Sequence, residues 1–163
     1  MSEDLRQRPA VQRVAAALAA AGSAAQVIAL AETARTAEDA ARALACPVGA
    51  IVKSLVFRLG DRPVLALVAG DRRCDPGRLA AVLGLPGTVA RADANLVRAA
   101  TGQSIGGVAP LGHPTALPTA IDASLERFAT LYAAAGHPHC VFATAYAELR
   151  RLTDAAVMVD TAP

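Results

Sequence analysis

The amino-terminal part of the chain has the apolar spacing of an amphipathic helix. Val11, Val14 and Leu18 recur at helical intervals, and Gly22 suits a carboxyl-terminal cap. The pattern predicts a helix over residues 9–22.

Downstream of this segment, apolar runs with strand character alternate irregularly with further helical segments. The predicted strands are 26–30, 51–59, 63–69, 129–135, 140–143 and 157–159. Residues whose side chains can accept hydrogen bonds from first-turn amides precede four more helices, namely Thr36, Asp75, Asp93 and Thr144. Hairpins mixed with helices predict an α+β, or mixed α/β, fold and not a regular parallel βαβ repeat.

Composition and length narrow the class of protein. The chain has 163 residues, of which 54% are hydrophobic, and this excludes a disordered chain and indicates one domain with a sizeable core. Polar residues, Gly or Pro interrupt every apolar stretch before about 18 residues, so we expect no membrane partner. The acidic, polar start is unlike a signal peptide. Three scattered cysteines, Cys46, Cys74 and Cys140, favour a reducing cytoplasm over a disulfide framework.

The net charge alone does not identify a partner, but one basic residue, Lys53, differs in type from all the others. The net charge of +2 permits a nucleic-acid partner without arguing for one. Lys53 is the one lysine among 16 basic residues, and it shares the face of a predicted strand with Ile51, Leu55 and Phe57. A buried ammonium is costly unless it reaches a partner, and arginine cannot replace a compact, titratable charge. Lys53 is therefore a candidate functional residue, and a lysine extending to the surface from a strand end is the alternative.

Residues 102–118 are rich in glycine and proline but keep apolar positions, which predicts a structured loop. Within it, Gly106 and Gly107 would let a ligand approach the backbone, with amides directed at an oxygen atom. Pro110 would rigidify the loop. A turn or bulge with purely structural glycines is the alternative interpretation.

A second motif in this loop matches a serine hydrolase. Gly102 to Gly106 fits G-x-S-x-G around Ser104, and Asp122 and His137 follow in the order expected of a triad. The motif needs a strand before the serine and a helix after it. Here a predicted helix precedes Ser104, while glycines and prolines follow it. A serine hydrolase therefore stays a less favoured alternative.

The sequence gives only weak support for a metal site or a reactive cysteine. The run 137–140 (His-Pro-His-Cys) could present zinc ligands, but no further ligands are apparent, so a hairpin turn with Cys140 in the core is favoured. Cys74 precedes a predicted helix that could activate its thiol, yet a buried, inert thiol is favoured. No P-loop or dinucleotide fingerprint occurs. We expect neither a metal nor a cofactor.

Lys53 in its apolar strand and the loop 106–112, at this spacing, resemble the YbaK/prolyl-tRNA-synthetase-associated editing domain family. Gly106 to Pro110 looks like the family's G-x-x-x-P loop. Segments 121–125, 135–138 and 147–160 are also similar, so the likeness covers about 9–160 of a single domain taken as 1–163. The resemblance implies a curved, mixed, partly barrel-like sheet flanked by helices.

The activity that this resemblance implies is that of a freestanding aminoacyl-tRNA deacylase. Such proteins hydrolyse the ester between a wrong small amino acid and the 3′ adenosine of a tRNA, typically proline tRNA. A second site is useful because one methylene gives a synthetase only about 1–3 kcal/mol of discrimination. The ester is already activated, so positioning and oxyanion stabilisation can suffice. The resemblance makes Lys53 and Gly106 catalytic and assigns substrate binding to Gly107, Val108, Ala109 and Pro110.

The implied partner is the tRNA acceptor end with its esterified amino acid, and prolyl-tRNA synthetase is a further candidate. Phosphate contacts are expected to dominate, and the candidate side chains are Arg72, Arg73, Arg78, Arg150 and Arg151. A non-catalytic module that binds tRNA or a synthetase through the same pocket remains the alternative. His113, in a Gly-His-Pro turn, is interpreted as structural, with a role in the site left open.

Overall fold

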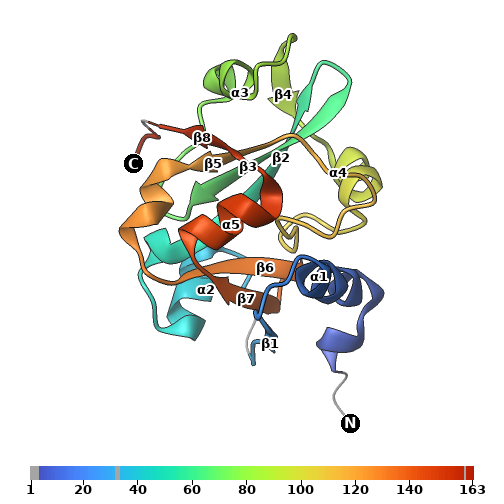
Figure 1. Ribbon diagram of the computed structural model, residues 1–163, viewed down its shortest axis with the longest axis vertical. Helices are drawn as coiled ribbons and strands as arrows, with labels where there is room; N and C mark the ends of the chain where they lie inside the picture. Colours follow the sequence, from blue (N-terminus) through green and yellow to red (C-terminus); the bar gives the residue numbers. More distant parts are fainter. Residues whose placement is uncertain (1–3, 32–33, 160) are drawn as a thin grey trace.

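A computed structural model describes residues 4–31, 34–159 and 161–163 and shows a mixed sheet between helices (Figure 1). Its eight strands are β1 (Val27–Ala29), β2 (Ile51–Leu59), β3 (Arg62–Ala69), β4 (Val89–Arg91), β5 (Thr119–Asp122), β6 (Leu131–His137), β7 (Cys140–Thr144) and β8 (Ala156–Met158). The order is β1-β7-β6-β2-β3-β5-β8, and β4 also pairs with β2. The pairs β2–β6, β3–β5 and β5–β8 are parallel and the others antiparallel, which confirms the mixed α/β class.

Five α-helices flank this sheet: α1 (Pro9–Ala20), α2 (Ala37–Leu44), α3 (Pro76–Leu83), α4 (Ala94–Thr101) and α5 (Tyr146–Thr153). Short 3-10 helices occur at η1 (Leu5–Gln7), η2 (Val48–Ala50) and η3 (Ala123–Arg127). The side chains of Thr36, Asp75 and Asp93 accept first-turn amides, as predicted. The predicted cap at Thr144 is wrong, because this residue ends β7 and its hydroxyl donates to Glu148 while Ala145 is the N-cap.

Strand β3 lies at the centre of the core and is buried on both faces. All six residues from Val64 to Ala69 are 0% exposed. Leu65 and Leu67 face a cluster that includes side chains of α1 and α5. Val64 and Val68 face a second cluster covered by Leu79 of α3. Apolar burial on both sides makes β3 the centre of the fold, and the partly buried β2 pairs with it along eight residues.

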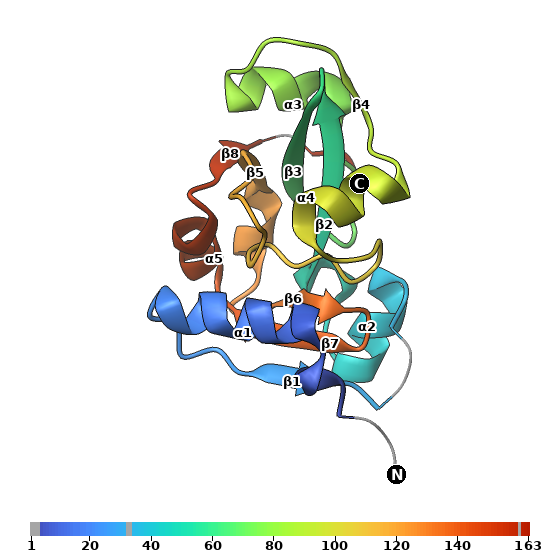
Figure 2. The same ribbon diagram turned by 90° about the vertical axis from the view of Figure 1, so that its right-hand side faces the viewer.

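The sheet is strongly twisted along its length. In Figure 2, β2 and β3 run vertically, whereas β6, β7 and β1 run across the lower part of the molecule. Within the described residues the edge strands β1 and β8 do not pair with each other, so the sheet is open. β6 and β4 pair with opposite ends of the same edge of β2, at residues 51–52 and 57–59.

Two strands were absent from the sequence prediction. β4 and β5 are short, and the pattern over 102–118 correctly predicted a structured loop but not the strand that follows it. The strand predicted over 129–135 is shifted to Leu131–His137, with a register irregularity between Ala134 and His137.

Candidate functional site

The candidate site lies where one edge of β2 loses its partners. β3 pairs with β2 from Val52 to Leu59 along one edge. Along the other edge, β6 pairs with residues 51–52 and β4 with residues 57–59. Over residues 53–56, no described strand pairs with this second edge, and the loop 105–108 lies beside the gap.

Two adjoining pockets occupy the gap. The first has a volume of about 320 Å³ and is lined by α2 and the segment before it, by β2 and β6, and by the loop. Its alanines include Ala34, Ala37, Ala40 and Ala134. The second, of about 590 Å³, extends along β2 toward β4. Both share the same rim, formed by Ser54, Leu55, Ile105, Gly106 and Val108. We call the first the small pocket and the second the β4 pocket.

The glycine loop is held in place by backbone contacts. Gly106 has φ +95°, a conformation that glycine adopts easily, and a Cβ on Gly107 would lie 2.9 Å from the backbone of His137. Gly107 donates to Ser104 O at 3.0 Å and accepts from the Gly136 amide at 3.0 Å. The loop therefore packs directly onto the β6–β7 turn.

The hydrogen bonds of the loop determine which amides are open to a ligand. The Gly107 amide is engaged by Ser104, and the Ala109 amide donates to the buried Gln103 Oε1 at 2.7 Å. Pro110 has no amide hydrogen. The amides of Gly106 and Val108 have no acceptor among the described residues, and both residues line the two pockets. These two amides are the candidate donors to a substrate oxygen.

The six predicted site residues thus fall into two groups. Lys53, Gly106 and Val108 line the small pocket, so the structure brings the strand lysine and the loop together. Gly107, Ala109 and Pro110 are buried and line neither pocket. In this arrangement, the second group supports the loop from behind.

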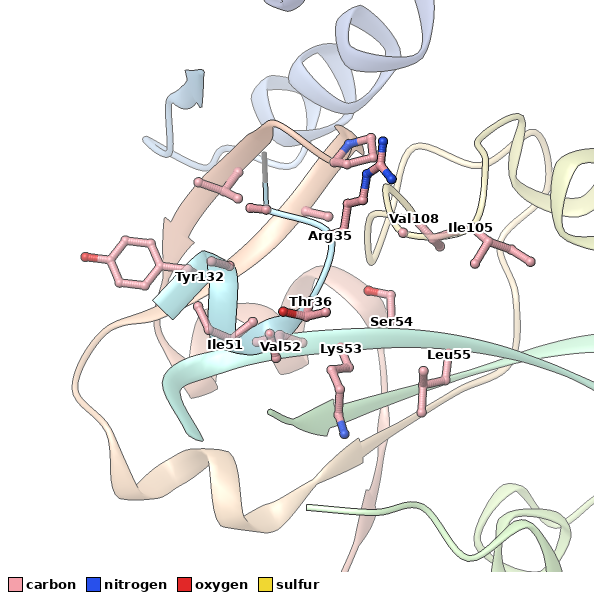
Figure 3. Close-up of a pocket in the computed structure, with 17 residues that line it drawn as sticks. Arg35, Thr36, Ile51, Val52, Lys53, Ser54, Leu55, Ile105, Val108 and Tyr132 are labelled. Carbon is pink, nitrogen blue, oxygen red and sulfur yellow. The ribbon is translucent and has the colours of Figure 1, made fainter. Parts of the chain in front are cut away.

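The ammonium of Lys53 is directed away from the loop. Figure 3 shows its side chain leaving β2 on the face opposite to Ser54 and Val108. Its Nζ donates to the main-chain carbonyl of Arg72 at 2.6 Å. This contact supplies the partner that a partly buried ammonium requires. The Lys53 charge interacts with the thiol of Cys74, a residue that lines the β4 pocket.

Several pocket residues were not among the predicted ones. The Ser54 hydroxyl is buried at the rim of both pockets and has no hydrogen-bond partner in the described structure. Arg35 and Thr36 lie on the same side of β2 as Ser54 (Figure 3). Arg35 borders the small pocket and Arg91 the β4 pocket, and both are exposed. The signal for Ser54 was its place beside Lys53 in the middle of a mainly apolar strand.

Comparison with known proteins places the chain in a family. A model of the aminoacyl-tRNA editing domain matches residues 31–152. The chain belongs to the aminoacyl-tRNA editing domain family.

Related proteins match this editing domain over most of their length. YwhH of Bacillus subtilis, an uncharacterized protein, is 32% identical over 126 residues, which are 77% of this chain and 79% of YwhH. A crystal structure described as a "putative trans-editing enzyme for prolyl tRNA synthetase" is 39% identical, with a TM-score of 0.88 over 96% of this chain and 98% of that one. The hypothetical protein APE2540 is 25% identical, with a TM-score of 0.82 over 93% and 99%.

The structure does not have the strand–serine–helix arrangement that the serine-hydrolase alternative requires. Ser104 is exposed and follows α4, and no described helix follows it before β5. The Asp122 carboxylate accepts from the Ala69 and Ser124 amides and from the Thr161 hydroxyl. Asp122 therefore ties β3, η3 and the carboxyl-terminal segment together.

The thiols and the His-Pro-His-Cys run show structural roles. Burial, together with the nearby carboxylates of Asp75 and Asp122, raises the pKa of Cys74 to about 11, which keeps its thiol protonated at neutral pH. Cys140 is 0% exposed and follows the hairpin turn, as predicted. The described residues contain no group of three potential metal ligands. None of the described helices is long and apolar enough to cross a membrane.

His113 supports the loop from outside the two pockets. Its Nε2 lies 2.8 Å from the carbonyl oxygen of Ala109, so the neutral ring donates there, and burial lowers the pKa of His113. It lines neither the small pocket nor the β4 pocket. The geometry therefore favours the structural interpretation of His113.

We expect His113 to make folding stability depend on pH. The folded-state pKa lies below the unfolded value of about 6.5, so this histidine binds its proton more readily in the unfolded chain. Its stabilising contribution is full above pH ~6.5 and is lost as the pH falls toward the folded pKa. In urea titrations from pH 7.5 to 5, His113→Gln should show a smaller fall in unfolding free energy than the unmodified protein. Equal falls in both proteins would contradict the assignment.

Proposed function

We propose that this protein hydrolyses the ester of a mischarged small amino acid on tRNA, with proline tRNA as the substrate. The observation that carries the proposal is the pair of unengaged amides, Gly106 and Val108, at the rim of a small, largely apolar pocket. Family membership supports the same class of reaction. Prolyl-tRNA synthetase is the proposed source of the mischarged substrate.

The proposed chemistry needs positioning more than a strong nucleophile. As the ester carbonyl is attacked, negative charge develops on its oxygen, and the Gly106 and Val108 amides would stabilise that charge. The loop is already fixed by Gln103 and by the β6–β7 turn, so little reorganisation accompanies the reaction. The alanines that line the small pocket leave room for a small aliphatic side chain. The unpartnered Ser54 hydroxyl is available to hydrogen-bond a polar group of the substrate.

In this proposal, the positive charge of Lys53 binds the end of the tRNA. Its ammonium makes one hydrogen bond, to the Arg72 carbonyl, and this leaves two N–H groups unengaged within the described residues. We assign these groups to the terminal phosphate or ribose of the tRNA. The neutral Cys74 thiol nearby would not compete for that charge.

A deacylation assay tests the proposed activity. Proline tRNA would be charged separately with Ala, Ser, Cys, Thr and 2-aminobutyrate, with correctly charged Pro as the control. We expect at least one small mischarged residue to be released much faster than Pro. If every ester survives at the uncatalysed rate while the tRNA still binds, the chain is a binding module and the proposed function fails.

Two exposed arginines should contribute to tRNA affinity. Arg35 and Arg91 border the pockets and have no ion-pair partner in the described structure. We expect Arg35→Ala and Arg91→Ala each to weaken binding and to reduce the slope of log affinity against log salt by about 1 for each phosphate that is no longer neutralised. Arg62→Ala, at an exposed position of β3 outside both pockets, is the matched control. An unchanged salt slope in Arg35→Ala and Arg91→Ala would show that neither contacts phosphate.

A further inference from the structure

The β4 pocket has no role in the chemistry described above. It lies next to the small pocket, shares its rim at Gly106 and Val108, and is the larger of the two. Its walls are mainly apolar and include Phe57, Pro76 and Val89. A flat, weakly polar group attached to the reacting ester would fit such a space.

The unpaired edge of β2 gives this pocket a defined hydrogen-bond pattern. The Gly70 amide donates to Ile51 O at 2.8 Å, so Ile51 and every second residue after it direct their backbone groups toward β3. The intervening residues direct theirs toward the other edge, where β6 covers Val52 and β4 covers Arg58.

Ser54 and Val56 lie between these two covered positions. The carbonyl of Ser54 and the amide of Val56 point outward without a strand partner among the described residues, and both residues line the β4 pocket. The carbonyl of Ser54 and the amide of Val56 are successive groups on this edge, one an acceptor and the other a donor. An unpaired strand edge offers its backbone groups to whatever occupies the space beside it, so a ligand in the β4 pocket can bond to both.

This acceptor–donor pair matches the Watson–Crick edge of adenine. The N6 amino group of adenine can donate to a carbonyl, and its N1 can accept from an amide. Guanine and hypoxanthine present the reverse order and would oppose both groups. Cytosine has the same order but a smaller ring, which would leave part of the β4 pocket empty.

We propose that the β4 pocket binds the terminal adenine of the tRNA, with its N6 group on the Ser54 carbonyl and its N1 on the Val56 amide. This inference rests on the proposed deacylase function, because the amino acid is esterified to the ribose of that same nucleoside. The shared rim lets the ribose lie beside Gly106 while the base enters one pocket and the amino acid the other. Ile105, 63% exposed on the rim, would cover the bound nucleoside.

Substrate analogues test the hydrogen-bond pattern without changing the protein. Short acceptor-end substrates would carry alanine on adenosine, 1-deazaadenosine, 7-deazaadenosine or inosine. We expect kcat/KM to fall about tenfold or more with 1-deazaadenosine, since the Val56 amide loses its acceptor, and about a hundredfold or more with inosine, since both backbone groups then face a group of the same kind. 7-Deazaadenosine, which keeps N1 and N6, should react like adenosine. Equal rates for adenosine and 1-deazaadenosine would overturn the proposal and leave the deacylase function intact.

Nuclear magnetic resonance tests the subsite independently of hydrolysis. In the ¹⁵N-labelled protein, adenosine 5′-monophosphate should shift the Val56 amide resonance, and inosine 5′-monophosphate at the same concentration should not. If none of the esters is hydrolysed but this shift is seen, the adenine subsite stands and the proposed function fails. No difference between the two nucleotides at Val56 would overturn the subsite.

A variant of the protein that fills the β4 pocket gives a third test of where the base binds. Ala90, in β4, lines the β4 pocket but not the small pocket. Ala90→Leu is expected to raise KM for the adenosine substrate about tenfold or more with little change in kcat. Ala16→Leu, at an exposed position of α1, is the matched control. A wild-type KM in folded Ala90→Leu would contradict the proposed placement of the base.

Discussion

Gly107→Ala should lower kcat/KM for deacylation by about a hundredfold or more, because the loop would have to move away from the β6–β7 turn. A Cβ at this position would lie 2.9 Å from the backbone of His137 and from Pro138 Cδ. Neither neighbour can rotate away as a flexible side chain would, so the loop itself must shift. Displacing catalytic groups by about 1 Å can cost about a hundredfold in rate. Single-turnover deacylation of the preferred substrate measures the effect.

Variants at two other glycines distinguish the effect of this steric clash from the effect of backbone strain. Gly106→Ala meets only Pro138 Cγ, at 3.9 Å, but forces alanine into φ +95°. Gly22→Ala imposes a similar strain, at φ +75°, where nothing lies within 4 Å. Each should cost about 1–2 kcal/mol of stability, and Gly22→Ala should keep full activity. If Gly107→Ala is as active as Gly22→Ala, the loop does not position the reacting groups.

Lys53→Met should lower kcat/KM about a hundredfold while leaving the protein folded. The substitution keeps the aliphatic stem but removes the charge assigned to the tRNA end, together with the 2.6 Å hydrogen bond to Arg72 O. One charge-assisted hydrogen bond contributes about 1.5–3 kcal/mol, so unfolding free energy should fall by no more than that. Deacylation rates and urea unfolding, measured on the same sample, separate the two effects.

Lys53→Arg and chemical modification serve as controls for the lysine. The broad guanidinium does not reproduce a compact ammonium beside the Arg72 carbonyl, so arginine should rescue activity only in part. Since the chain has one lysine, acetylation removes the charge of its single ε-amine, whereas reductive methylation keeps it. Acetylated protein that deacylates at the unmodified rate would exclude a charge role for Lys53.

Local signals predicted most of the helices and the central hairpin. The caps at Thr36, Asp75 and Asp93 act within a few residues, so the sequence around them is sufficient to predict the helix starts. β5 was missed because its four residues are all buried and show no alternation that would mark a strand. Its pairing with β3 and β8 depends on contacts far along the chain.

The candidate site was predictable only in part, because it too depends on contacts between segments that are far apart in the sequence. Alternation along β2 correctly put Lys53 on one face with Leu55 and Phe57. It could not show that the loop 105–108 lies on the other side, with Ser54 and Val52. The gap over residues 53–56 exists because β6 pairs only with residues 51–52 and β4 only with residues 57–59, and no local pattern encodes these long-range pairings.

The order in which the strands join has a consequence for folding. The β2–β3 hairpin closes locally, and β4 follows it within the same stretch of chain. The opposite wall needs Ile51 to pair with Tyr132, a contact that closes a long loop and forms slowly. The pockets are therefore complete only late in folding, after the newly synthesised chain has supplied β6, and a nascent chain that ends before β6 lacks one wall of the site.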